Sequence, residues 1–426
     1  MISDERLRSV LRSPSAALLV GDLVRVILVF LVVGLCLLAL VYNTVLLNLM
    51  ARELYFNDFG KFYYSARYFL EHRDMYATNP ATLIPVSTTA SQQFLNMNPP
   101  HFHLLLIPIA WLSLPQAFIV WAVANVIALA MSLRLIVKEL EIRCTAAGTL
   151  WMTLGLSWFV GTSANIVTGQ LTWLLMWPVT VAWVALRRRQ WLKAAVILGI
   201  CASIKPFLLA VFPYFVLRRQ TKAVVVAVLT TAICFAVALP IFGLQAHRAW
   251  LAAIGRAGDW TSGGLNASLL SMLARSLATN PFYEPLSRTP SFITPIWVAG
   301  CLGIGAMATW CLYRHRHNPD ADADVLILLL FAVIVSPLGW VYYLWLPLGP
   351  AVALAIRRSR IPGMVKLGVA GLMCPLQITV LGQPNGLLTA TLGSIYVWSL
   401  AFIYFGVASD VLRRPAQQYA TPVAVS

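Results

Sequence analysis

Charged residues are scarce in this sequence, and acidic residues are the scarcest. Only 11% of its 426 residues are Asp, Glu, Lys or Arg, and just 15 of them are acidic. A soluble globular protein carries about 25% charged and about 45–50% apolar residues, whereas 60% of this chain is hydrophobic. The composition therefore excludes a soluble enzyme, a disordered chain and a DNA-binding domain, and we expect no nucleic-acid partner.

Short catalytic motifs are also missing. The chain has no GxGxxG, Walker loop, HExxH, GxSxG or zinc-ligand spacing. Its seven cysteines form no CxxC pair and lie almost entirely in apolar runs, where a cysteine behaves as a small hydrophobe. His101 and His103 lie close together, but no other residue is placed to complete a metal site. We therefore expect no metal and no soluble cofactor, so an activated substrate would arrive by another route, such as a lipid.

Long apolar runs dominate the rest of the chain. A membrane-crossing helix needs about 20 apolar residues, which predicts a single all-α, multi-pass membrane domain over residues 1–426, with about 10–13 transmembrane or re-entrant helices. Two polar stretches, 51–102 and 244–290, are predicted as large outer loops. The predicted crossings are 24–50, one within 103–137, 145–162, 171–186, 223–242, 292–313, 325–338, 342–356, 364–381 and 388–409.

The basic residues predict the orientation. The net charge is +16, and 22 of the 31 Lys and Arg residues fall on one set of connecting segments. Eight fall in the two large loops, and Lys205 alone lies inside an apolar region. Since basic residues collect on cytoplasmic loops, both termini are predicted inside and both large loops outside. Residues 191–217 have basic residues at both ends and a break at Lys205-Pro206, so we predict two short helices that dip in from the cytoplasm and back.

The first outer loop contains a pattern with helical spacing. One face carries only apolar and aromatic residues, and the opposite face carries charged ones. The apolar face consists of Phe59, Phe62, Tyr63, Ala66, Phe69 and Leu70, and the charged face of Lys61, Arg67 and Glu71. This pattern predicts an amphipathic helix at the membrane surface. A loop helix packed on the protein is the alternative.

Carboxylates are rare enough to be considered one by one. Nine lie among basic residues on the predicted inside segments, where we expect solvated turns, and none is predicted mid-membrane, as a proton relay would usually require. The outer loops hold Glu53, Asp58, Glu71, Asp74, Asp259 and Glu284. Asp58 stands out because aromatic residues surround it shortly after the first crossing. It could act as a general base in a partly dry site, or it could cap a helix that begins at Phe59.

Four other polar residues are candidates for binding. Lys205 lies at a helix break, where its ammonium could meet a phosphate or extend to the membrane interface. Gln170, at the predicted outer end of a crossing, and Asn266, in the second outer loop, could hydrogen-bond sugar hydroxyls. Arg275 could bind phosphate. The plainer alternatives are a helix cap for Asn266 and a surface charge for Arg275.

Taken in order, these residues resemble the pattern of a known family. The motifs are Asp58 with the aromatics that follow it, Asp74-Met-Tyr76, Asn98-Pro-Pro100, Gly169-Gln170, Lys205-Pro206, Asn266-Ala-Ser268-Leu269 with Arg275, and Ser336-Pro-Leu-Gly-Trp340. Each motif is short, and their order and spacing carry the match. From about residue 50 to residue 345, the chain resembles glycosyltransferase family 87, of the GT-C membrane class.

The resemblance implies a polyprenyl-phosphate-sugar donor, with mannose as the first choice, and a lipid or glycan acceptor in the bilayer. It implies an inverting transfer at the outer face of a bacterial inner membrane, with Asp58 as the general base. Lys205 or Arg275 would stabilise the leaving phosphate as charge develops on it. The sugar or acceptor would be bound by Gln170, Asn266, Trp340 and Tyr342.

Two positions depart from the family's Ser-Pro-x-Ser-Trp-x-His element. Gly339 stands where the family has Ser, and Tyr342 where it commonly has His. These departures bear on the sugar, the acceptor and the activity rather than on the fold. A transporter or flippase of lipid-linked sugars is the alternative, because transporters use discontinuous helices at binding sites, although no inverted repeat supports it. A relative that binds without catalysing is a third hypothesis.

Overall fold

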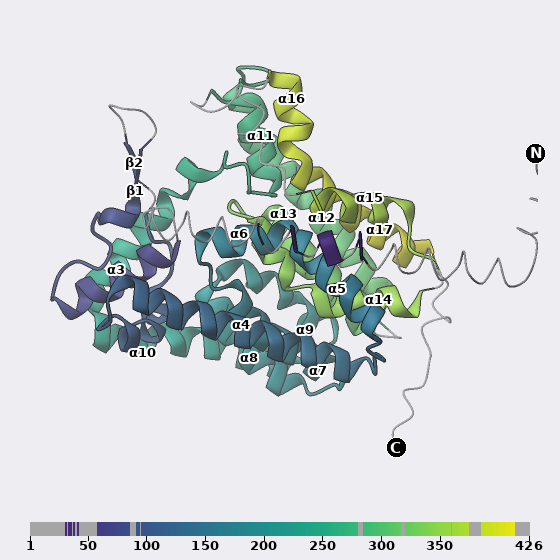
Figure 1. The fold of residues 1–426 in the computed structure, drawn as a ribbon, viewed down its shortest axis with the longest axis horizontal. Coiled ribbons are helices and arrows are strands. Elements are labelled where there is room, and N and C mark those ends of the chain that lie inside the picture. The colour runs from purple at the N-terminus through teal and green to yellow at the C-terminus, as the bar shows by residue number, and fades with distance from the viewer. Residues whose placement is uncertain are drawn as a thin grey trace, which may run out of the picture.

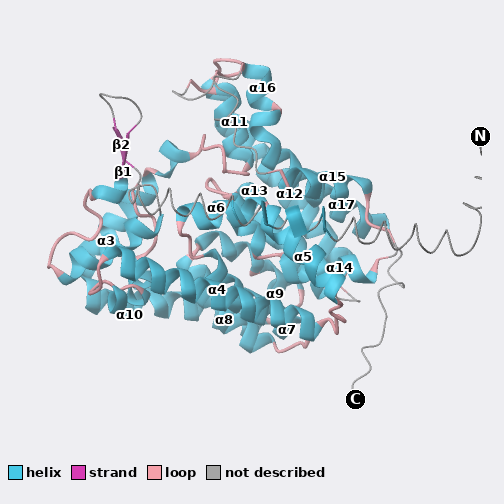
Figure 2. Cartoon of the chain, in the orientation of Figure 1, coloured by secondary structure: helices cyan, strands magenta, loops and turns pink. Residues whose placement is uncertain are grey.

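The computed structural model describes residues 58–85, 91–93, 95–279, 284–316, 320–358, 360–374 and 385–413, with isolated positions between 30 and 41. Within these ranges the chain is helical almost throughout, and two three-residue strands, β1 (Leu83–Pro85) and β2 (Ser91–Gln93), pair antiparallel (Figure 2). The prediction of an all-α, multi-pass membrane protein is confirmed. Most of the predicted first crossing, 24–50, lies outside the described residues.

The helices follow one another with short connections. The α-helices of the first half are α3 (Asp58–Leu70), α4 (Leu114–Glu139), α5 (Ala146–Trp158), α6 (Val160–Thr168), α7 (Thr172–Arg187), α8 (Trp191–Ile204), α9 (Pro213–Leu217) and α10 (Thr221–Gly255). Those of the second half are α11 (Leu269–Leu277), α12 (Ile293–Arg314), α13 (Ala321–Val335), α14 (Leu348–Arg357), α15 (Gly363–Leu372), α16 (Gly386–Ala390) and α17 (Ile395–Arg413). Short 3₁₀ segments join them: η2 (Pro80–Thr82), η3 (Pro100–Leu105), η4 (Ile107–Ile109), η5 (Pro206–Val211), η6 (Ala257–Trp260), η7 (Pro290–Phe292), η8 (Val341–Trp345) and η10 (Leu392–Ser394).

Four helical stretches of the described chain are long and apolar enough to cross a membrane. They are Leu114–Glu139, Thr221–Gly255, Pro290–Arg314 and Gly386–Arg413. A fifth span is formed if α5 and α6, which are bent by 57° at Phe159, count as one. The other apolar helices hold 10 to 17 residues, so they are shorter than a single crossing requires.

Helix α7 is buried along most of its length. It packs against α4 on one side and α8 on another, and α8 in turn packs along α10 (Figure 1). Because apolar side chains face its neighbours all around, Met176, Ala182 and Trp183 are almost fully buried. The helix has 16 residues, which corresponds to about 24 Å at 1.5 Å per residue. We call the end near Thr172 the Asp58 end, since Asp58 lies beside it, and the end near Arg187 the arginine end.

The break predicted in residues 191–217 is present. Helix α8 ends at Ile204, Lys205 adopts an extended conformation, and Pro206 opens η5. Proline is suited to the first position of a helix because its missing N–H would have no partner there. The two short helices run back against each other, as the sequence predicts.

Helix α3 does not lie on the surface. Its apolar face packs into an aromatic cluster in which the Phe59 ring centroid is 5.6 Å from that of Trp121 and the Phe62 centroid is 5.0 Å from that of Phe102. Lys61, predicted on the exposed face, is buried. The prediction that the charged face of this helix is exposed was wrong for Lys61, because protein covers α3 on more than its apolar side. This packing agrees with the alternative of a loop helix packed on the protein.

The second outer loop begins later than predicted. Helix α10 continues past Phe242 to Gly255, so the first part of the predicted 244–290 loop is helical. A kink separates the two halves at Gly243, whose φ of 76° is accessible to glycine and strained for other residues. Pro240 lies one turn earlier and removes a helical hydrogen bond, which accounts for the bend.

The two segments predicted as outer loops pack on each other. The indole of Trp260 donates to the Gln93 carbonyl at 2.9 Å, and that of Trp250 donates to the Met97 carbonyl at 3.1 Å. The ring centroids of Phe69 and Phe242 are 4.6 Å apart. The loops therefore form one cap over the Asp58 end.

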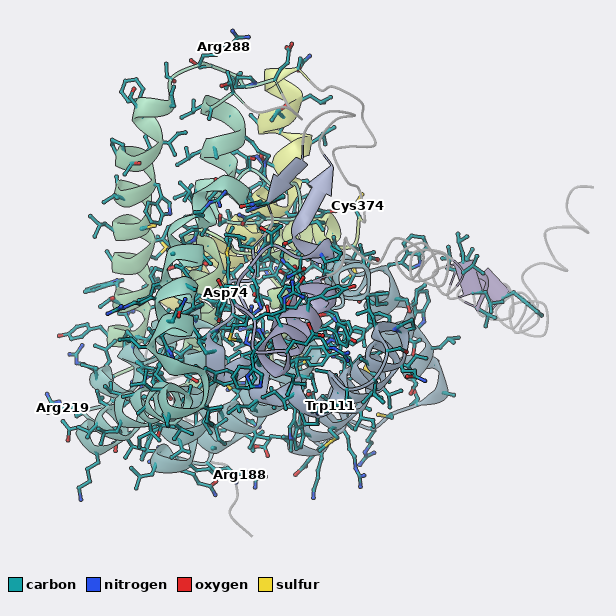
Figure 3. All side chains as sticks on the ribbon, turned by 90° about the vertical axis from the view of Figure 1, so that its left-hand side faces the viewer. Asp74, Trp111, Arg188, Arg219, Arg288 and Cys374 are labelled. Carbon is teal, nitrogen blue, oxygen red and sulfur yellow. The ribbon has the colours of Figure 1, made fainter. Side chains whose placement is uncertain are left out.

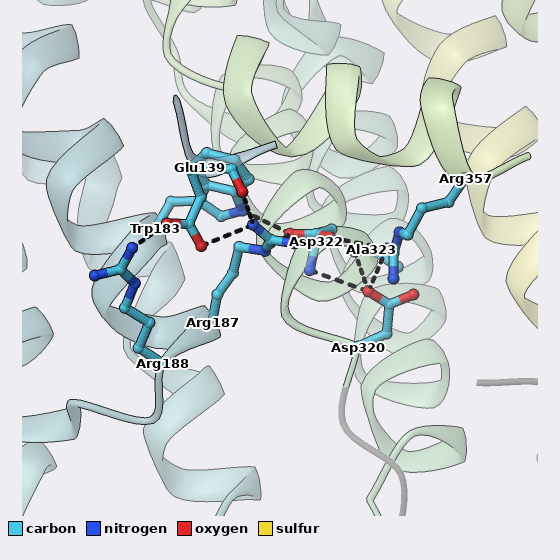
Figure 4. Close-up of polar contacts among 8 residues, drawn as sticks. All are labelled: Glu139, Trp183, Arg187, Arg188, Asp320, Asp322, Ala323 and Arg357. Atoms are coloured by element: carbon cyan, nitrogen blue, oxygen red, sulfur yellow. Dashed lines mark hydrogen bonds and ion pairs between the residues drawn. The ribbon is translucent and has the colours of Figure 1, made fainter. Parts of the chain in front are cut away.

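The arginine end is held by ion pairs whose carboxylates are largely buried. The Glu139 carboxylate binds Arg187 at 2.8 Å and Arg188 at 2.6 Å, and Asp322 binds Arg187 at 3.2 Å and Arg357 at 2.9 Å (Figure 4). The expectation of solvated turns here was wrong, because Asp322 is buried and shares its arginines with neighbouring helices.

Two more aspartates join this end of the bundle. Asp320 caps α13 by accepting from backbone N–H groups, and its carboxylate binds Arg357 at 2.9 Å. Burial raises the pKa of Asp320, but the adjacent guanidinium outweighs this and leaves the pKa below its ordinary value. Asp324 binds Arg218 and, at 2.7 Å, the His315 imidazole. These pairs join α7, α9, α13 and α14.

Candidate active site

Asp58 is the first residue of α3 and is buried. Its Oδ1 lies 2.5 Å from Nζ of Lys61, and its Oδ2 accepts a hydrogen bond from Nε2 of Gln170. Its carboxylate lies in the first turn of α3, at the positive end of the helix dipole. Asp58 is thus an ordered carboxylate bound by two side chains.

Lys61 is the residue of this site that the sequence analysis missed. It lies one helical turn after Asp58, and its side chain is as buried as the carboxylate that it binds. Burial lowers the pKa of the Lys61 ammonium, and the Asp58 charge opposes this. An acid and a base three residues apart on a helix are neighbours, so this spacing could have indicated the pair.

Gln170 joins two parts of the site. Gly169 ends α6 with a φ of 62°, and this left-handed turn brings the next side chain toward α3. The Gln170 amide donates both to Asp58 and, at 2.9 Å, to the hydroxyl of Tyr342. Asp58, Gln170 and Tyr342 come from three distant parts of the sequence and form one hydrogen-bonded chain.

Aromatic rings form one wall of the site. The rings of Trp340 and Tyr342 stack with centroids 6.1 Å apart and planes 20° from parallel. Tyr343 meets Tyr342 edge-on at 4.7 Å. Trp340 is half-buried, so part of its ring remains accessible. Stacked aromatic faces of this kind suit an apolar sugar face or an acceptor ring.

Lys205 approaches from the break between α8 and η5. Its Nζ is 5.6 Å from the centroid of the Tyr343 ring, and its charge interacts with those of Asp58 and Lys61. The side chain is half-buried. Two ammonium groups thus accompany one carboxylate, and the local excess of positive charge suits an anionic substrate group.

Asn266 lies behind the aromatic wall. It is fully buried and forms a backbone bridge with Trp340, while its Nδ2 donates to the Pro337 carbonyl at 2.9 Å. The helix-cap alternative was wrong for this residue, since Ser268 caps α11 by accepting from the Ser271 N–H. Asn266 joins the second outer loop to the segment that carries Trp340 and Tyr342.

Packing explains why position 339 is Gly here, where the family element has Ser. A Cβ added there would lie 2.0 Å from the Val333 carbonyl oxygen and 3.1 Å from Cβ of Ser268. The backbone N–H of Ala267 also donates to the Gly339 carbonyl at 2.7 Å. A serine at this position would force the two segments apart.

Arg275 is not the exposed charge of the plainer alternative. It is 1% exposed, and its guanidinium donates to the Gly263 carbonyl at 2.7 Å, to Ser271 Oγ at 2.6 Å and to Ser394 Oγ at 3.3 Å. These bonds hold the second outer loop against η10. Binding of a phosphate by Arg275 stays a prediction.

The two histidines stabilise the first outer loop. His103 is buried, with Nε2 2.7 Å from the Asn96 amide and Nδ1 3.3 Å from the Pro100 carbonyl. Burial lowers its pKa to about 3. His101 contacts the Ser203 hydroxyl at 3.0 Å and thereby ties the loop to α8 near Lys205. No group of three His, Cys, Asp or Glu residues that could hold a metal is found in the described part of the chain.

The arrangement is equipped for one proton transfer. Among the described residues around the site, Asp58 is the carboxylate, and a carboxylate with fixed partners can accept a proton from a hydroxyl group. The nearby ammonium groups can stabilise negative charge on a departing group. This combination suits transfer of a group from a good anionic leaving group to an alcohol.

Comparisons with known proteins agree with this geometry. Residues 96–337, more than half of the chain, match the family model of glycosyltransferase family 87. The chain is also similar to a polyprenol-phosphate-mannose-dependent α-(1-2)-phosphatidylinositol mannoside mannosyltransferase of Mycobacterium tuberculosis, with 24% identity and 74% of each chain covered. No solved structure matches the chain. The protein therefore belongs to glycosyltransferase family 87.

Proposed function

We propose that this protein transfers a sugar, with mannose as the first choice, from a polyprenyl-phosphate donor to a hydroxyl of a lipid or glycan acceptor, with Asp58 as the general base. The observation that carries the proposal is the buried Asp58 carboxylate fixed between Lys61 and Gln170. The Mycobacterium tuberculosis relative is named for a polyprenol-phosphate-mannose donor and a phosphatidylinositol mannoside acceptor, which supports this class of substrates.

The reaction requires one base and one leaving group. Asp58 accepts the proton of the acceptor hydroxyl while the acceptor oxygen forms a bond to the anomeric carbon. The bond from that carbon to the phosphate oxygen breaks, and polyprenyl phosphate leaves with the electron pair. A single in-line displacement inverts the anomeric centre. A glycoside hydrolase usually needs a second carboxyl group as acid, whereas a phosphate leaves without one.

Among the cations, we propose that Lys205 stabilises the leaving phosphate, because its half-buried ammonium approaches Asp58 from the helix break. Arg275 is proposed to act on the phosphate only through the loop that it holds, since protein oxygens already occupy its donors. Gln170, Trp340 and Tyr342 would contact the sugar or acceptor, and Asn266 would hold Trp340 in place.

We propose that the Asp58 end faces the exterior of a bacterial inner membrane and that the arginine end and both termini face the cytoplasm. The support comes from the distribution of basic residues, which collect on cytoplasmic segments. A donor embedded in the outer leaflet would then reach Asp58 without a soluble cofactor.

Purified protein in lipid vesicles, supplied with polyprenyl-phosphate-[14C]mannose and a lipid extract from the native host, tests the proposal. A new labelled glycolipid is the expected result. Labelled donor that crosses the vesicle membrane without forming a glycoside would overturn the proposal in favour of a transporter. If neither product nor transport occurs with mannose, the mannose assignment is wrong, and polyprenyl-phosphate-arabinofuranose is the next donor.

A further inference from the structure

A pocket lies at the arginine end of α7. It has a volume of about 340 Å³ and is formed between the last turns of α4 and α7 and the start of α8. Small-molecule sites occupy about 300–1,000 Å³, so the pocket can hold a headgroup-sized ligand. It extends along α7 from Trp177 to Arg188, its basic residues lie at the end of α7 opposite Asp58, and the transfer reaction does not use it.

Basic side chains line one part of this pocket. Lys138, Arg188 and Lys193 converge on it from three different helices or turns. Lys138 and Lys193 are exposed, and neither side chain forms an ion pair with another described residue. Figure 3 places Arg188 at the lower edge of the molecule, opposite Arg288 in the loop before α12.

The one acidic residue that lines the pocket does not oppose an anion. Both oxygens of the Glu139 carboxylate are occupied, one by Arg187 at 2.8 Å and the other by Arg188 at 2.6 Å (Figure 4). The ammonium groups of Lys138 and Lys193 therefore give the pocket a net positive charge. An anionic ligand is the chemistry that this charge selects.

The remaining wall of the pocket is apolar. Leu135, Trp177 and Val181 line it along the helices, on the side away from the basic residues. A free phosphate has no apolar part that could contact this wall. A phospholipid has an anionic headgroup and apolar chains in the same order, and basic pockets between helices at a membrane surface bind such headgroups. Tryptophan is also enriched where headgroups meet hydrocarbon.

We propose that this pocket binds the headgroup of one anionic phospholipid in the leaflet at the arginine end, with Lys138 and Lys193 as its phosphate ligands. The lipid would join α4, α7 and α8 where ion pairs already link α7 to α4 and α13. The site is distinct from the donor site, because it lies at the other end of α7.

Binding of dioctanoyl phosphatidylglycerol to the full-length protein in detergent tests the proposal, with dioctanoyl phosphatidylcholine and inorganic phosphate as comparison ligands. We expect phosphatidylglycerol to raise the unfolding temperature and the other two to have little effect. In Lys138→Gln/Lys193→Gln the dissociation constant for phosphatidylglycerol should rise about tenfold or more. The assay needs neither donor nor acceptor, so its outcome is independent of the proposed transfer.

Arg219→Gln/Lys222→Gln provides a matched control. Both residues are exposed, and the pair removes two positive charges outside the pocket. This variant should bind phosphatidylglycerol as the wild type does. Equal losses in the two variants would overturn the proposal in favour of diffuse surface charge. Protection by inorganic phosphate equal to that by the lipid would show that the pocket takes any anion, and would overturn the lipid assignment.

Discussion

The two ends of α7 hold buried carboxylates in different ways. At the arginine end, Asp322 binds two arginines that in turn bind Glu139 and Asp320. At the other end, Asp58 is held by one lysine and one amide. Arginine presents a rigid fork of five donors that suits a fixed ion pair, whereas lysine has a single ammonium group on a flexible chain. The first arrangement fastens helices together, and the second leaves a carboxylate able to exchange partners during a reaction.

The difference shows that burial alone does not mark a catalytic acid. Asp58, Asp322 and Asp324 are all nearly inaccessible. Only Asp58 lies beside a half-buried lysine and a wall of stacked aromatic rings. The partners of a carboxylate therefore distinguish a reactive acid from a structural one more clearly than its exposed fraction.

The largest expected effect on stability lies at the arginine end. Arg218→Met removes the cation that binds Asp324 and leaves that carboxylate buried with His315 as its remaining ion-pair partner in the described chain. Breaking a buried pair by removing one partner costs about 3–5 kcal/mol. The unfolding free energy in detergent should fall by that amount, while transfer per folded molecule stays the same. A loss of transfer without a loss of stability would contradict the structural role that we assign to the arginine end.

At the Asp58 end the expected effect is on the rate. Lys61→Gln removes the charge that holds Asp58, so transfer should fall about 10–100-fold, less than the 10²–10⁴-fold that a positioned acid or base itself contributes. Lys61→Arg keeps the charge and should restore part of the rate, as measured by initial rates of glycolipid formation. Lys222→Gln, an exposed lysine at the other end, is the control and should transfer normally. A normal rate in Lys61→Gln would show that Lys61 does not position the base.

Arg275 tests whether a buried arginine has a structural role at the Asp58 end as well. If its guanidinium holds the loop, Arg275→Gln should lower the unfolding free energy by about 1–3 kcal/mol through buried acceptors left without donors, and transfer should fall in parallel with the folded fraction. Thermal unfolding and initial rates on the same preparation measure both. A fall in rate with unchanged stability would instead support a direct contact with the phosphate.

The smallest expected effect concerns pH. The buried His103 has a pKa of about 3 when folded and an ordinary value of about 6.5 when unfolded. Its neutral form contributes stability that is complete above pH 6.5 and is lost as pH falls toward 3. The unfolding temperature should therefore drop between pH 7 and pH 4, and it should drop less in His103→Gln. An identical drop in the variant and the wild type would contradict this assignment.

Much of the fold could be predicted from the sequence, since apolar runs fix most helices to within a few residues. The break at Lys205-Pro206 was readable from a charge next to a proline in an apolar segment. The extension of α10 to Gly255 was not, because polar residues after Gly243 resemble a loop. The ion pairs of Asp320, Asp322 and Asp324 depend on contacts between distant helices, which no local pattern reveals.

Some residues of the candidate site could likewise be predicted from the sequence, and others could not. Asp58, Lys205, Gln170 and Tyr342 were predicted by position and family pattern, and the structure brings them together from four segments. Lys61 was missed because helical periodicity assigned it to the exposed face. The bonds of Arg275 to the second outer loop could not be foreseen, since they join a helix to carbonyl groups and to a serine more than 100 residues away.

The most direct test of the account compares Asp58→Asn with Asp322→Asn. Both variants change one buried carboxylate to an amide, at opposite ends of α7. We expect Asp58→Asn to lose transfer by about 10²–10⁴-fold per folded molecule, beyond the fall in unfolding temperature that follows from breaking its buried pair with Lys61. Asp322→Asn should unfold at a lower temperature and transfer normally per folded molecule. Transfer by Asp58→Asn at the wild-type rate would contradict the central claim, because the proposed base would then not be needed.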